Sequence, residues 1–229
     1  CMSEDKNSLP ALPEGWVWAT VGELIEPSRE KVNPLKIEEM PYISLEHIDK
    51  DTGRLLGYGV SSEIRSTKTR FYSGDLLYGK LRPYLNKVHL ANFEGVCSTD
   101  ILVFPRKDYI SNSFLLYRFL CRDFVNYASQ NVRGVNLPRG DFRVLSQFKI
   151  SLPPLQEQHR IVEKIEELLT KLDAGVAALK RTQIQLKQYR QSVLKAAVEG
   201  ELTKGWREAH RGELEPASDL LARILKERR

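Results

Sequence analysis

The chain has 229 residues, a formal net charge of +5 and an apolar share of 41%, which is enough for one full globular domain and a further element. No apolar run approaches the roughly 18 residues that span a bilayer, and no signal peptide is evident. Cys97 and Cys121 form neither a metal-type spacing nor a disulfide framework. These features predict a cytoplasmic protein with reduced thiols and no membrane partner, and the charge leans mildly towards a polyanionic ligand.

The N-terminal segment, residues 1–11, precedes the first structural signal. Cys1 stands before Met2, which indicates a residue left by cloning ahead of the native start, and we expect the rest of the segment to be flexible. The stretch LPEGWVWATVGELI at Leu12–Ile25 then predicts a strand and a short helix. These elements open a globular domain that we expect at residues 12–155.

Short β-like runs broken by Gly, Pro, Asn and Asp fill this domain. They are Pro41–Ile48, Asp75–Leu81, Lys87–Phe93, Asp100–Pro105 and Phe148–Pro153. One helix is expected at Ser113–Asn126, because its apolar residues recur at spacings of three and four and a serine can cap its start. Strands around a few helices predict an α+β fold of about 150 residues.

The pattern changes after Pro153-Pro154 to that of one long, coiled-coil-type α-helix, expected at residues 156–200. Such a helix would be about 65 Å long, and its apolar stripe needs another long helix, in this chain or another. Gly175 is expected to mark a bend or a close crossing. Residues 201–229 predict a linker and a short helix from about Ala217. The helix-pairing stripe comprises Ile161, Ile165, Leu168, Leu172, Val176, Leu179, Leu186 and Val193.

The stretch GDLLYGKL at Gly74–Leu81 nearly matches the phosphate-binding loop of nucleotide hydrolases. That loop needs Ser or Thr at its last position to bind magnesium, and it runs into a helix. Here Leu81 takes the position and Pro83 follows, which argues against a nucleotide site. The four histidines are scattered without a metal-protease pattern. The sequence therefore supports no catalytic residues and no metal site.

Basic and aromatic residues around Gly79–Lys87 instead form a candidate DNA-binding segment. Long cations interleaved with tyrosines suit contacts to phosphates and base edges. The alternative is that these cations sit on solvated strands and protect a sheet edge. The first candidates are Lys80, Arg82, Tyr84 and Lys87, with Lys68 and Arg70 as phosphate contacts.

A second candidate is the loop SQNVRGVNLPRGDFR at Ser129–Arg143. Its glycines and proline keep it irregular and exposed. Arg133, Asn136 and Arg139 project from it, and Asn can pair with adenine N6 and N7. The alternative is an ordinary surface loop of mixed polarity.

Four stretches together resemble the DNA-specificity subunit of type I restriction-modification systems. The resemblance covers nearly the whole chain, and the LPPLQEQHRIV junction is its most specific part. The stretches, in chain order, are LPEGWVWATVGELI, FYSGDLLYGKLRPYLNKVHLANFEGVCSTDILVF, NLPRGDFRVLSQFKISLPPLQEQHRIVEKIE and AAVEGELTKGWRE.

The resemblance implies a target recognition domain followed by a spacer helix. Such a subunit is not an enzyme: it reads a bipartite double-stranded DNA target and positions a methyltransferase (modification) subunit and a restriction/translocase subunit. S-adenosylmethionine, ATP and Mg²⁺ are expected on those partners and no cofactor on this chain. Two recognition units, with antiparallel spacer helices, make a complete subunit.

This chain holds one such unit, so we expect it to read one half of the target. Its second specificity half is expected either in cis, if the chain is a truncated half, or as a homodimer, if it is a natural half-subunit. The linker after Gly200 favours truncation. Parts of the Gly79–Lys87 stretch could be scaffold common to the family, in which case the bases are read elsewhere, for example at Pro41–Arg65. An alternative function is a coiled-coil assembly scaffold whose globular domain binds protein; a nucleotide-dependent enzyme is disfavoured by Leu81.

Overall fold

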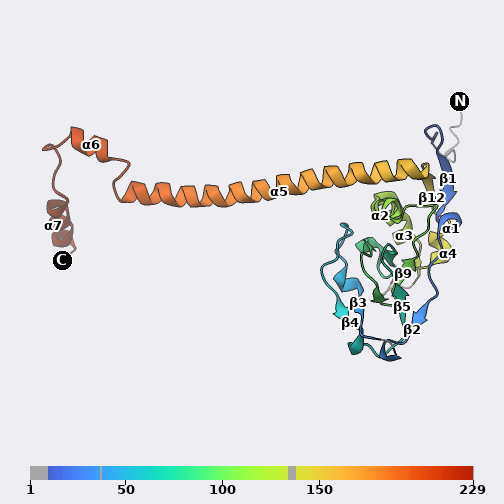
Figure 1. The fold of residues 1–229 in the computed structure, drawn as a ribbon. Coiled ribbons are helices and arrows are strands. Elements are labelled where there is room, and N and C mark those ends of the chain that lie inside the picture. Colours follow the sequence, from blue (N-terminus) through green and yellow to red (C-terminus); the bar gives the residue numbers. More distant parts are fainter. Residues whose placement is uncertain (1–9, 37, 134–137, 229) are drawn as a thin grey trace. The chain divides into compact units, whose positions relative to one another are not determined.

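The computed structural model describes residues 10–36, 38–133 and 138–228, and the chain divides into two compact units, Cys1–Glu166 and Glu167–Arg229 (Figure 1). The first unit mixes strands with helices, and the second is helical. This confirms the predicted α+β class with a long helix and a short C-terminal helix. The expectation of a flexible N-terminus falls mostly on residues 1–9, which lie outside the described residues.

The first unit opens with the predicted strand and short helix. Strand β1 (Val17–Thr20) pairs antiparallel with β12 (Lys149–Leu152), so the two ends of the unit meet. Helix α1 (Val21–Leu24) follows at once, and the Glu23 carboxylate accepts hydrogen bonds from the Thr20 N–H and hydroxyl at 2.6 and 2.7 Å. These bonds satisfy a donor that the first turn of a helix leaves unpaired.

A three-stranded antiparallel sheet forms the centre of the unit, in the order β7-β6-β9. Its strands are β6 (Leu76–Gly79), β7 (Val88–Leu90) and β9 (Ile101–Phe104). Successive side chains of a strand point to opposite faces. Leu76 and Tyr78 therefore enter one hydrophobic core, whereas Leu77 enters a second. This is why the β6 sequence is apolar without alternation.

A five-stranded sheet carries the second core, in the order β2-β5-β8-β3-β4. Among the described strands of this sheet, β3 and β8 are the one parallel pair. A Cβ atom on Gly95 would lie 2.4 Å from the Pro41 carbonyl oxygen, so the close approach of β8 to β3 needs glycine. The strands are β2 (Lys31–Val32), β3 (Pro41–Ile43), β4 (Gly59–Val60), β5 (Lys68–Phe71) and β8 (Gly95–Cys97).

The single helix predicted at Ser113–Asn126 is wrong, because the chain forms two helices, α2 (Asn112–Leu120) and α3 (Arg122–Gln130). Cys121 between them is extended, with φ −67° and ψ 142°. The break allows Phe119 and Phe124 to stack at 4.3 Å in the first core. Cys121 stays hydrogen-bonded across the break, because its N–H donates to the Arg118 carbonyl at 3.3 Å and its carbonyl accepts from the Val125 N–H at 3.2 Å. The aromatic packing is therefore gained at little cost in hydrogen bonding.

Short elements complete the unit. Some of them replace parts of strands that the sequence predicted as longer. The run predicted at Pro41–Ile48 leaves the strand after Ile43 and turns. The 3₁₀ turns are η1 (Pro34–Lys36), η2 (Leu45–His47), η3 (Ser61–Glu63) and η4 (Pro83–Leu85), and the remaining elements are β10 (Val132–Arg133), β11 (Arg139–Gly140) and α4 (Phe142–Leu145).

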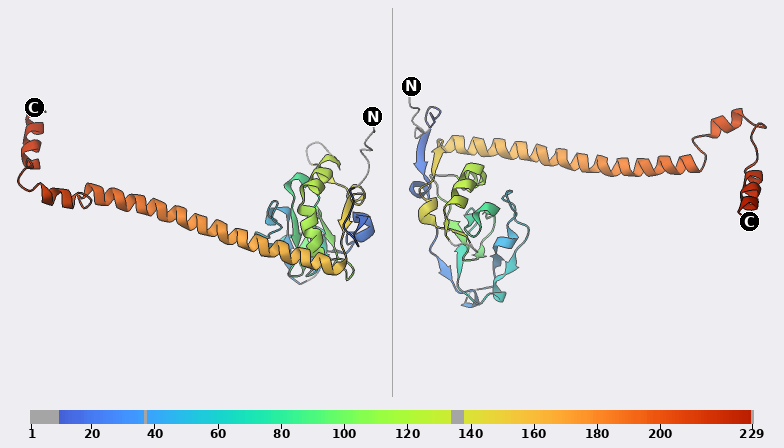
Figure 2. Two further views of the ribbon diagram at one scale, coloured as in Figure 1. Left: turned by 90° about the horizontal axis from the view of Figure 1, so that it is seen from above. Right: turned by 180° about the vertical axis from the view of Figure 1, so that it is seen from behind.

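The long helix α5 (Leu155–Val198) begins in the first unit, where Gln158 fixes its first turn. The buried Gln158 amide accepts a hydrogen bond from the Ser111 N–H at 3.0 Å and donates one to the Pro153 carbonyl at 2.9 Å. The neighbouring Glu157 carboxylate accepts one from the Trp16 indole at 3.0 Å. The first turns of α5 thereby lie beside α2 (Figure 2).

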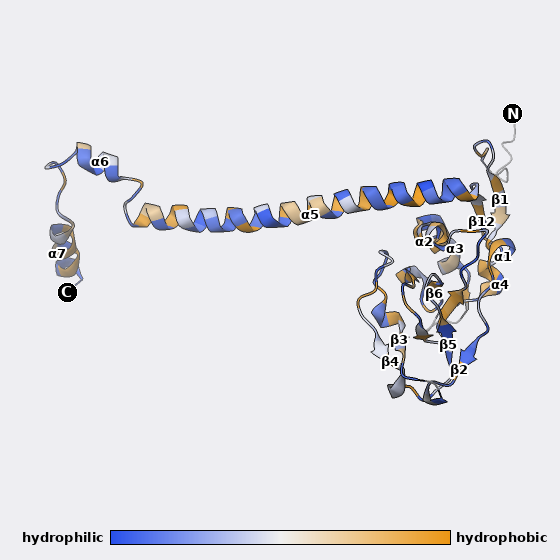
Figure 3. Cartoon of the chain, viewed as in Figure 1, coloured by the Kyte–Doolittle hydropathy of each residue, from blue (hydrophilic) through white to orange (hydrophobic). Residues whose placement is uncertain are grey.

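The second unit contains the rest of α5, α6 (Lys204–Ala209) and α7 (Ala217–Glu227). Helix α5 continues through Gly175 without interruption. Apolar residues recur along α5 and α7 among polar ones (Figure 3), and none of residues 167–228 is buried. Within the described parts of the chain, no helix is long and apolar enough to cross a membrane.

Candidate nucleic-acid interface

The segment Gly79–Lys87 forms a tight turn between β6 and β7, centred on η4. Arg82 and Asn86 flank η4 in the left-handed region, with φ of 53° and 45°. This turn leads into a strand, not into the helix that a nucleotide-binding loop requires. Arg82 and Tyr84 are exposed at its surface, and Lys80 is half-buried.

The loop around Arg139 lies directly against this turn, so the structure brings together the two segments that the sequence singled out. The Arg82 N–H donates to the Pro138 carbonyl at 2.8 Å, and the Gly140 N–H donates to the Lys80 carbonyl at 2.7 Å. Leu81 and Arg139 form an antiparallel bridge. Arg139, Lys80 and Arg82 thus share one end of the central sheet.

Asp100 joins the same cluster from the loop before β9. Its backbone carbonyl accepts a hydrogen bond from the Lys80 N–H at 2.9 Å, and its carboxylate accepts one from Arg139 Nε at 3.0 Å. This hydrogen bond and the charge of Asp100 raise the pKa of Arg139. Sequence reasoning missed Asp100, which no motif marks and whose partner lies 39 residues away.

Lys68 lies near this cluster but directs its charge inward. Thr69 pairs with Cys97, so Lys68 stands at the end of β8 that leads towards Asp100. Its side chain is buried, with Nζ 2.7 Å from the Ser66 hydroxyl and 5.8 Å from the centre of the Tyr42 ring. Burial raises the pKa of the Tyr42 hydroxyl. In this arrangement the Lys68 ammonium does not reach outward as Arg82 does.

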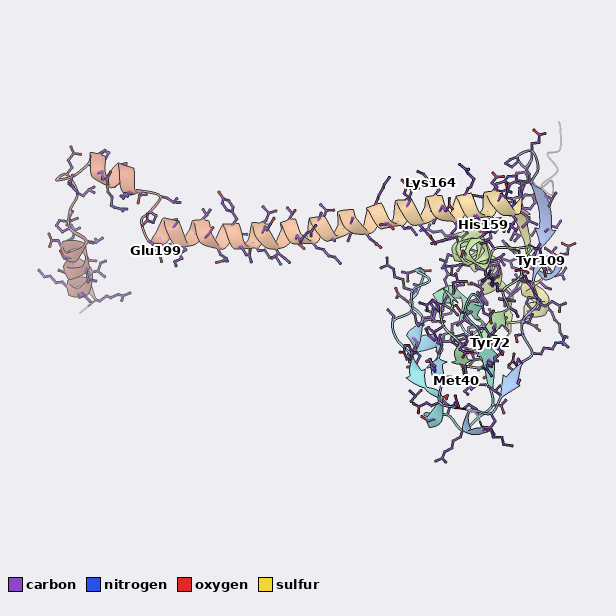
Figure 4. The ribbon with its side chains drawn as sticks, viewed as in Figure 1. Met40, Tyr72, Tyr109, His159, Lys164 and Glu199 are labelled. Atoms are coloured by element: carbon purple, nitrogen blue, oxygen red, sulfur yellow. The ribbon has the colours of Figure 1, made fainter. Side chains whose placement is uncertain are left out.

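Arg70, the other expected phosphate contact, lies two residues beyond Lys68 on β5 and pairs with Val96 of β8. Its guanidinium lies 3.4 Å from the Glu94 carboxylate and 5.1 Å from the centre of the Tyr72 ring. Arg70 lines a cavity of about 410 Å³ together with the acidic residues Glu38 and Glu39. Figure 4 labels Met40, which lines this cavity, and Tyr72. The structure therefore places Arg70 among acidic residues and does not bring it to the turn.

Lys87 fastens the segment Leu45–Leu56 to β7. Its ammonium donates to the Leu45 and Ile48 carbonyls at 2.6 and 2.8 Å. Nearby, His89 Nδ1 lies 2.9 Å from the Gly53 carbonyl; because a carbonyl only accepts, Nδ1 carries the proton. Burial lowers the pKa of His89. Through these bonds, the NKVHL stretch at Asn86–Leu90 supports the loop that contains Leu45, Ile48 and Gly53.

The remaining DNA-binding candidates are Arg133 and Asn136. The backbone of Arg133 pairs with Arg139 in the two-stranded β10-β11 sheet. Asn136 lies outside the described residues. Among the described residues, no group of three or more His, Cys, Asp or Glu side chains could hold a metal ion.

The helix-pairing residues fall into two groups. Ile161 and Ile165 are half-buried and line an apolar groove of about 330 Å³ together with Phe114, Tyr117 and Leu120 of α2. The other predicted residues lie beyond Glu166 and are exposed. They are Leu168, Leu172, Val176, Leu179, Leu186 and Val193.

Comparison with known proteins identifies relatives of this chain. Residues 13–188 match the family of type I restriction modification DNA specificity domains. The type I restriction enzyme EcoDI specificity subunit of Escherichia coli is 33% identical over 203 residues, which cover 88% of this chain and 45% of that protein. The chain spans about half the length of the curated relatives that it matches over most of its own length.

Two solved structures share the fold. The crystal structure of the HsdS subunit from Thermoanaerobacter tengcongensis superposes with a TM-score of 0.62 and 25% identity, covering 90% of this chain and 52% of that chain. A second, from work on complex assembly and conformational transition of the type I R-M system, has a TM-score of 0.63 and 24% identity, covering 91% and 53%. At this level of identity, the second likeness concerns the fold alone.

Proposed function

This chain belongs to the family of type I restriction modification DNA specificity domains, and on that premise we propose that it is a non-catalytic, sequence-specific DNA-binding subunit. It reads one half of a bipartite double-stranded target. The observation that carries the proposal is the convergence of two basic segments, distant in sequence, at one end of the central sheet. Lys80 and Arg82 come from one segment, and Arg139 comes from the other.

The chemistry of this cluster suits duplex DNA. Arg82 and Tyr84 are exposed beside the half-exposed Arg139, which provides cations for phosphates and a planar group for sugars or bases. Backbone hydrogen bonds lock both loops to each other, so little conformational freedom is lost on binding. We assign Arg82 and Lys80 to phosphate contacts. Lys68, Arg70 and Lys87 have a weaker claim, because each ammonium or guanidinium is engaged inside the unit.

The long helix α5 has a separate role in this function, which is to pair with a second helix. Its exposed stripe pairs with a second helix of the same kind, from another copy or from a second specificity half, and the pair fixes the spacing of two recognition domains. Two linked domains multiply base discrimination beyond the roughly 1–3 kcal/mol per base pair that each contact gives. A methyltransferase subunit and a restriction subunit then act on the DNA held there, and they carry S-adenosylmethionine, ATP and Mg²⁺. The name of the EcoDI relative, a restriction enzyme specificity subunit, supports this assignment.

A second candidate function is an assembly scaffold whose globular unit binds protein. Leu56 and Tyr58 favour it, because they are 68% and 59% exposed just before β4. A scaffold predicts association with protein but no salt-dependent affinity for DNA.

The test is a fluorescence anisotropy titration of the full chain with a pool of 30-base-pair duplexes of random sequence, at several salt concentrations. The proposal predicts affinity that falls steeply with salt. Arg82→Ala weakens binding to the whole pool and reduces the salt slope by about 1. Lys107→Ala, which removes an exposed cation beyond the far end of β9, serves as the control and leaves both unchanged. Absence of salt-dependent binding by the unmodified chain would favour the scaffold.

A further inference from the structure

The Arg139 side chain is held in an orientation unusual for a general phosphate contact. Its guanidinium is attached through Nε to the Asp100 carboxylate at 3.0 Å. Within the described parts of the chain, no hydrogen bond or ion pair engages its terminal Nη1 and Nη2 atoms. The Arg139 side chain is 47% exposed, whereas that of Asp100 is only 25% exposed. A fixed carboxylate thus supports an arginine whose outer edge faces solvent.

Asp100 is itself immobilised from two sides. Its backbone carbonyl accepts from the Lys80 N–H, and its backbone N–H donates to the Ser98 hydroxyl at 3.3 Å. The Arg139 backbone is held by the bridge to Leu81, next to the bond between Arg82 and Pro138. Both partners of the ion pair therefore start from anchored main chain, which limits the positions that the guanidinium can adopt.

This arrangement favours a base edge over a phosphate. A carboxylate beside a phosphate contact repels the DNA backbone and weakens binding to every sequence. The same carboxylate helps a base reader, because it cancels excess charge and fixes the plane of the guanidinium before binding. The free Nη1–Nη2 edge presents two parallel donors, and guanine presents two acceptors, O6 and N7, in the major groove.

We propose that Arg139 reads a guanine in the DNA half-site and that Asp100 is the positioning residue that sets the guanidinium for this contact. The inference rests on the proposed DNA-binding function and deepens it by naming a base and a positioning residue. Lys80 and Arg82, which flank the pair, supply contacts to the neighbouring phosphates. Lysine cannot replace Arg139, since an ammonium lacks the fork geometry.

The experiment is an in vitro selection of bound duplexes from a random library by the full chain, followed by sequencing. The unmodified chain should enrich a motif that contains a guanine. Arg139→Lys, which keeps the charge, should lose about tenfold to hundredfold of the preference at that one position. Asp100→Asn should relax the same position while affinity for the unselected pool stays equal or rises. Asp108→Asn makes the same charge change at an exposed residue beyond the far end of β9, and it should leave the motif intact.

The outcomes separate this inference from the proposed function. If the unmodified chain enriches no motif, sequence-specific binding itself fails and the inference fails with it. If it enriches a motif that Arg139→Lys and Asp100→Asn leave unchanged, the proposed function stands and the inference is overturned. If Asp100→Asn and Asp108→Asn both raise affinity equally without changing any position, Asp100 acts only through net charge, which also overturns it.

Discussion

The two units of this chain differ in whether they bury their apolar side chains. The first unit closes two hydrophobic cores on the faces of one central sheet. In the second unit, residues 167–228 bury no side chain, although leucine, isoleucine and valine recur along α5 and α7. Burial of apolar surface is the main favourable term in folding. The first unit therefore contains its own source of stability, whereas the second requires a partner surface.

The difference also separates two kinds of specificity. In the first unit, chemistry is carried by polar side chains fixed on a packed scaffold, such as Arg139 on Asp100. In the second unit, the exposed apolar stripe of α5 has no fixed polar side chains to direct binding. It therefore matches another helix that carries an apolar stripe of the same spacing. In the proposed function, the first unit recognises DNA and the second unit recognises another helix.

Truncation of a core aromatic residue should show the largest contrast between the units. Phe119 stacks on Phe124 and meets the edges of Tyr78 and Phe104, so Phe119→Ala should lower the free energy of unfolding of the first unit by about 3–5 kcal/mol. Leu179→Ala, at an exposed position, should change it by less than about 0.5 kcal/mol. Urea denaturation, followed by Trp16 and Trp18 fluorescence in a Trp206→Phe background, measures both. Equal effects would contradict the contrast.

Removal of the Gln158 amide should give a smaller effect at the point where α5 begins. Gln158→Leu leaves the Ser111 N–H and the Pro153 carbonyl without their partner, which costs about 1–3 kcal/mol of stability. Gln156→Leu, two residues earlier on the exposed side of the same turn, should be nearly neutral. The same denaturation experiment compares them. A neutral Gln158→Leu would mean that the junction is held by apolar packing instead.

The smallest expected effect is the pH dependence that His89 gives the first unit. Burial lowers its pKa in the folded state below the ordinary 6.5, so the unfolded chain binds a proton more readily. Stability is full above pH 6.5 and falls as the pH drops below it. His89→Gln should flatten the difference in unfolding free energy between pH 7.5 and pH 5.5. An unchanged difference would show that other groups cause it.

The sequence predicted elements whose pattern is long or strongly periodic. The apolar stripe placed the long helix within a residue or two at each end, and apolar runs located the three strands of the central sheet. It did not reveal β2, β4, β5 and β8, whose sequences are KV, GV, KTRF and GVC. These segments contain no apolar run like those of β6 and β9, and their pairing is decided by tertiary contacts.

For the candidate site, composition indicated Arg82 and Arg139 but could not tell outward cations from inward ones. The sequence pattern predicts Lys87 as a DNA-binding cation, yet its ammonium donates to the carbonyls of Leu45 and Ile48. Arg70 lies two residues from Lys68 on the same strand, but its guanidinium is held at the Glu94 carboxylate, whereas the Lys68 ammonium lies at the Ser66 hydroxyl. Sequence proximity of charges does not specify the partners that hold them.

The contrast between the two units is tested most directly by the solution mass of the intact chain, measured by light scattering over a range of concentrations. The double variant Leu172→Glu, Leu179→Glu is measured beside it. Both leucines are exposed on α5, and paired glutamates would repel a partner helix. If the partner helix comes from a second copy, we expect the unmodified chain to associate to twice the mass of one chain and the variant to stay monomeric with its first unit folded. An unmodified chain that stays monomeric at every concentration would assign the partner helix to a second specificity half. A variant that associates as well as the unmodified chain would contradict the claim that the stripe of the second unit is a helix-pairing surface.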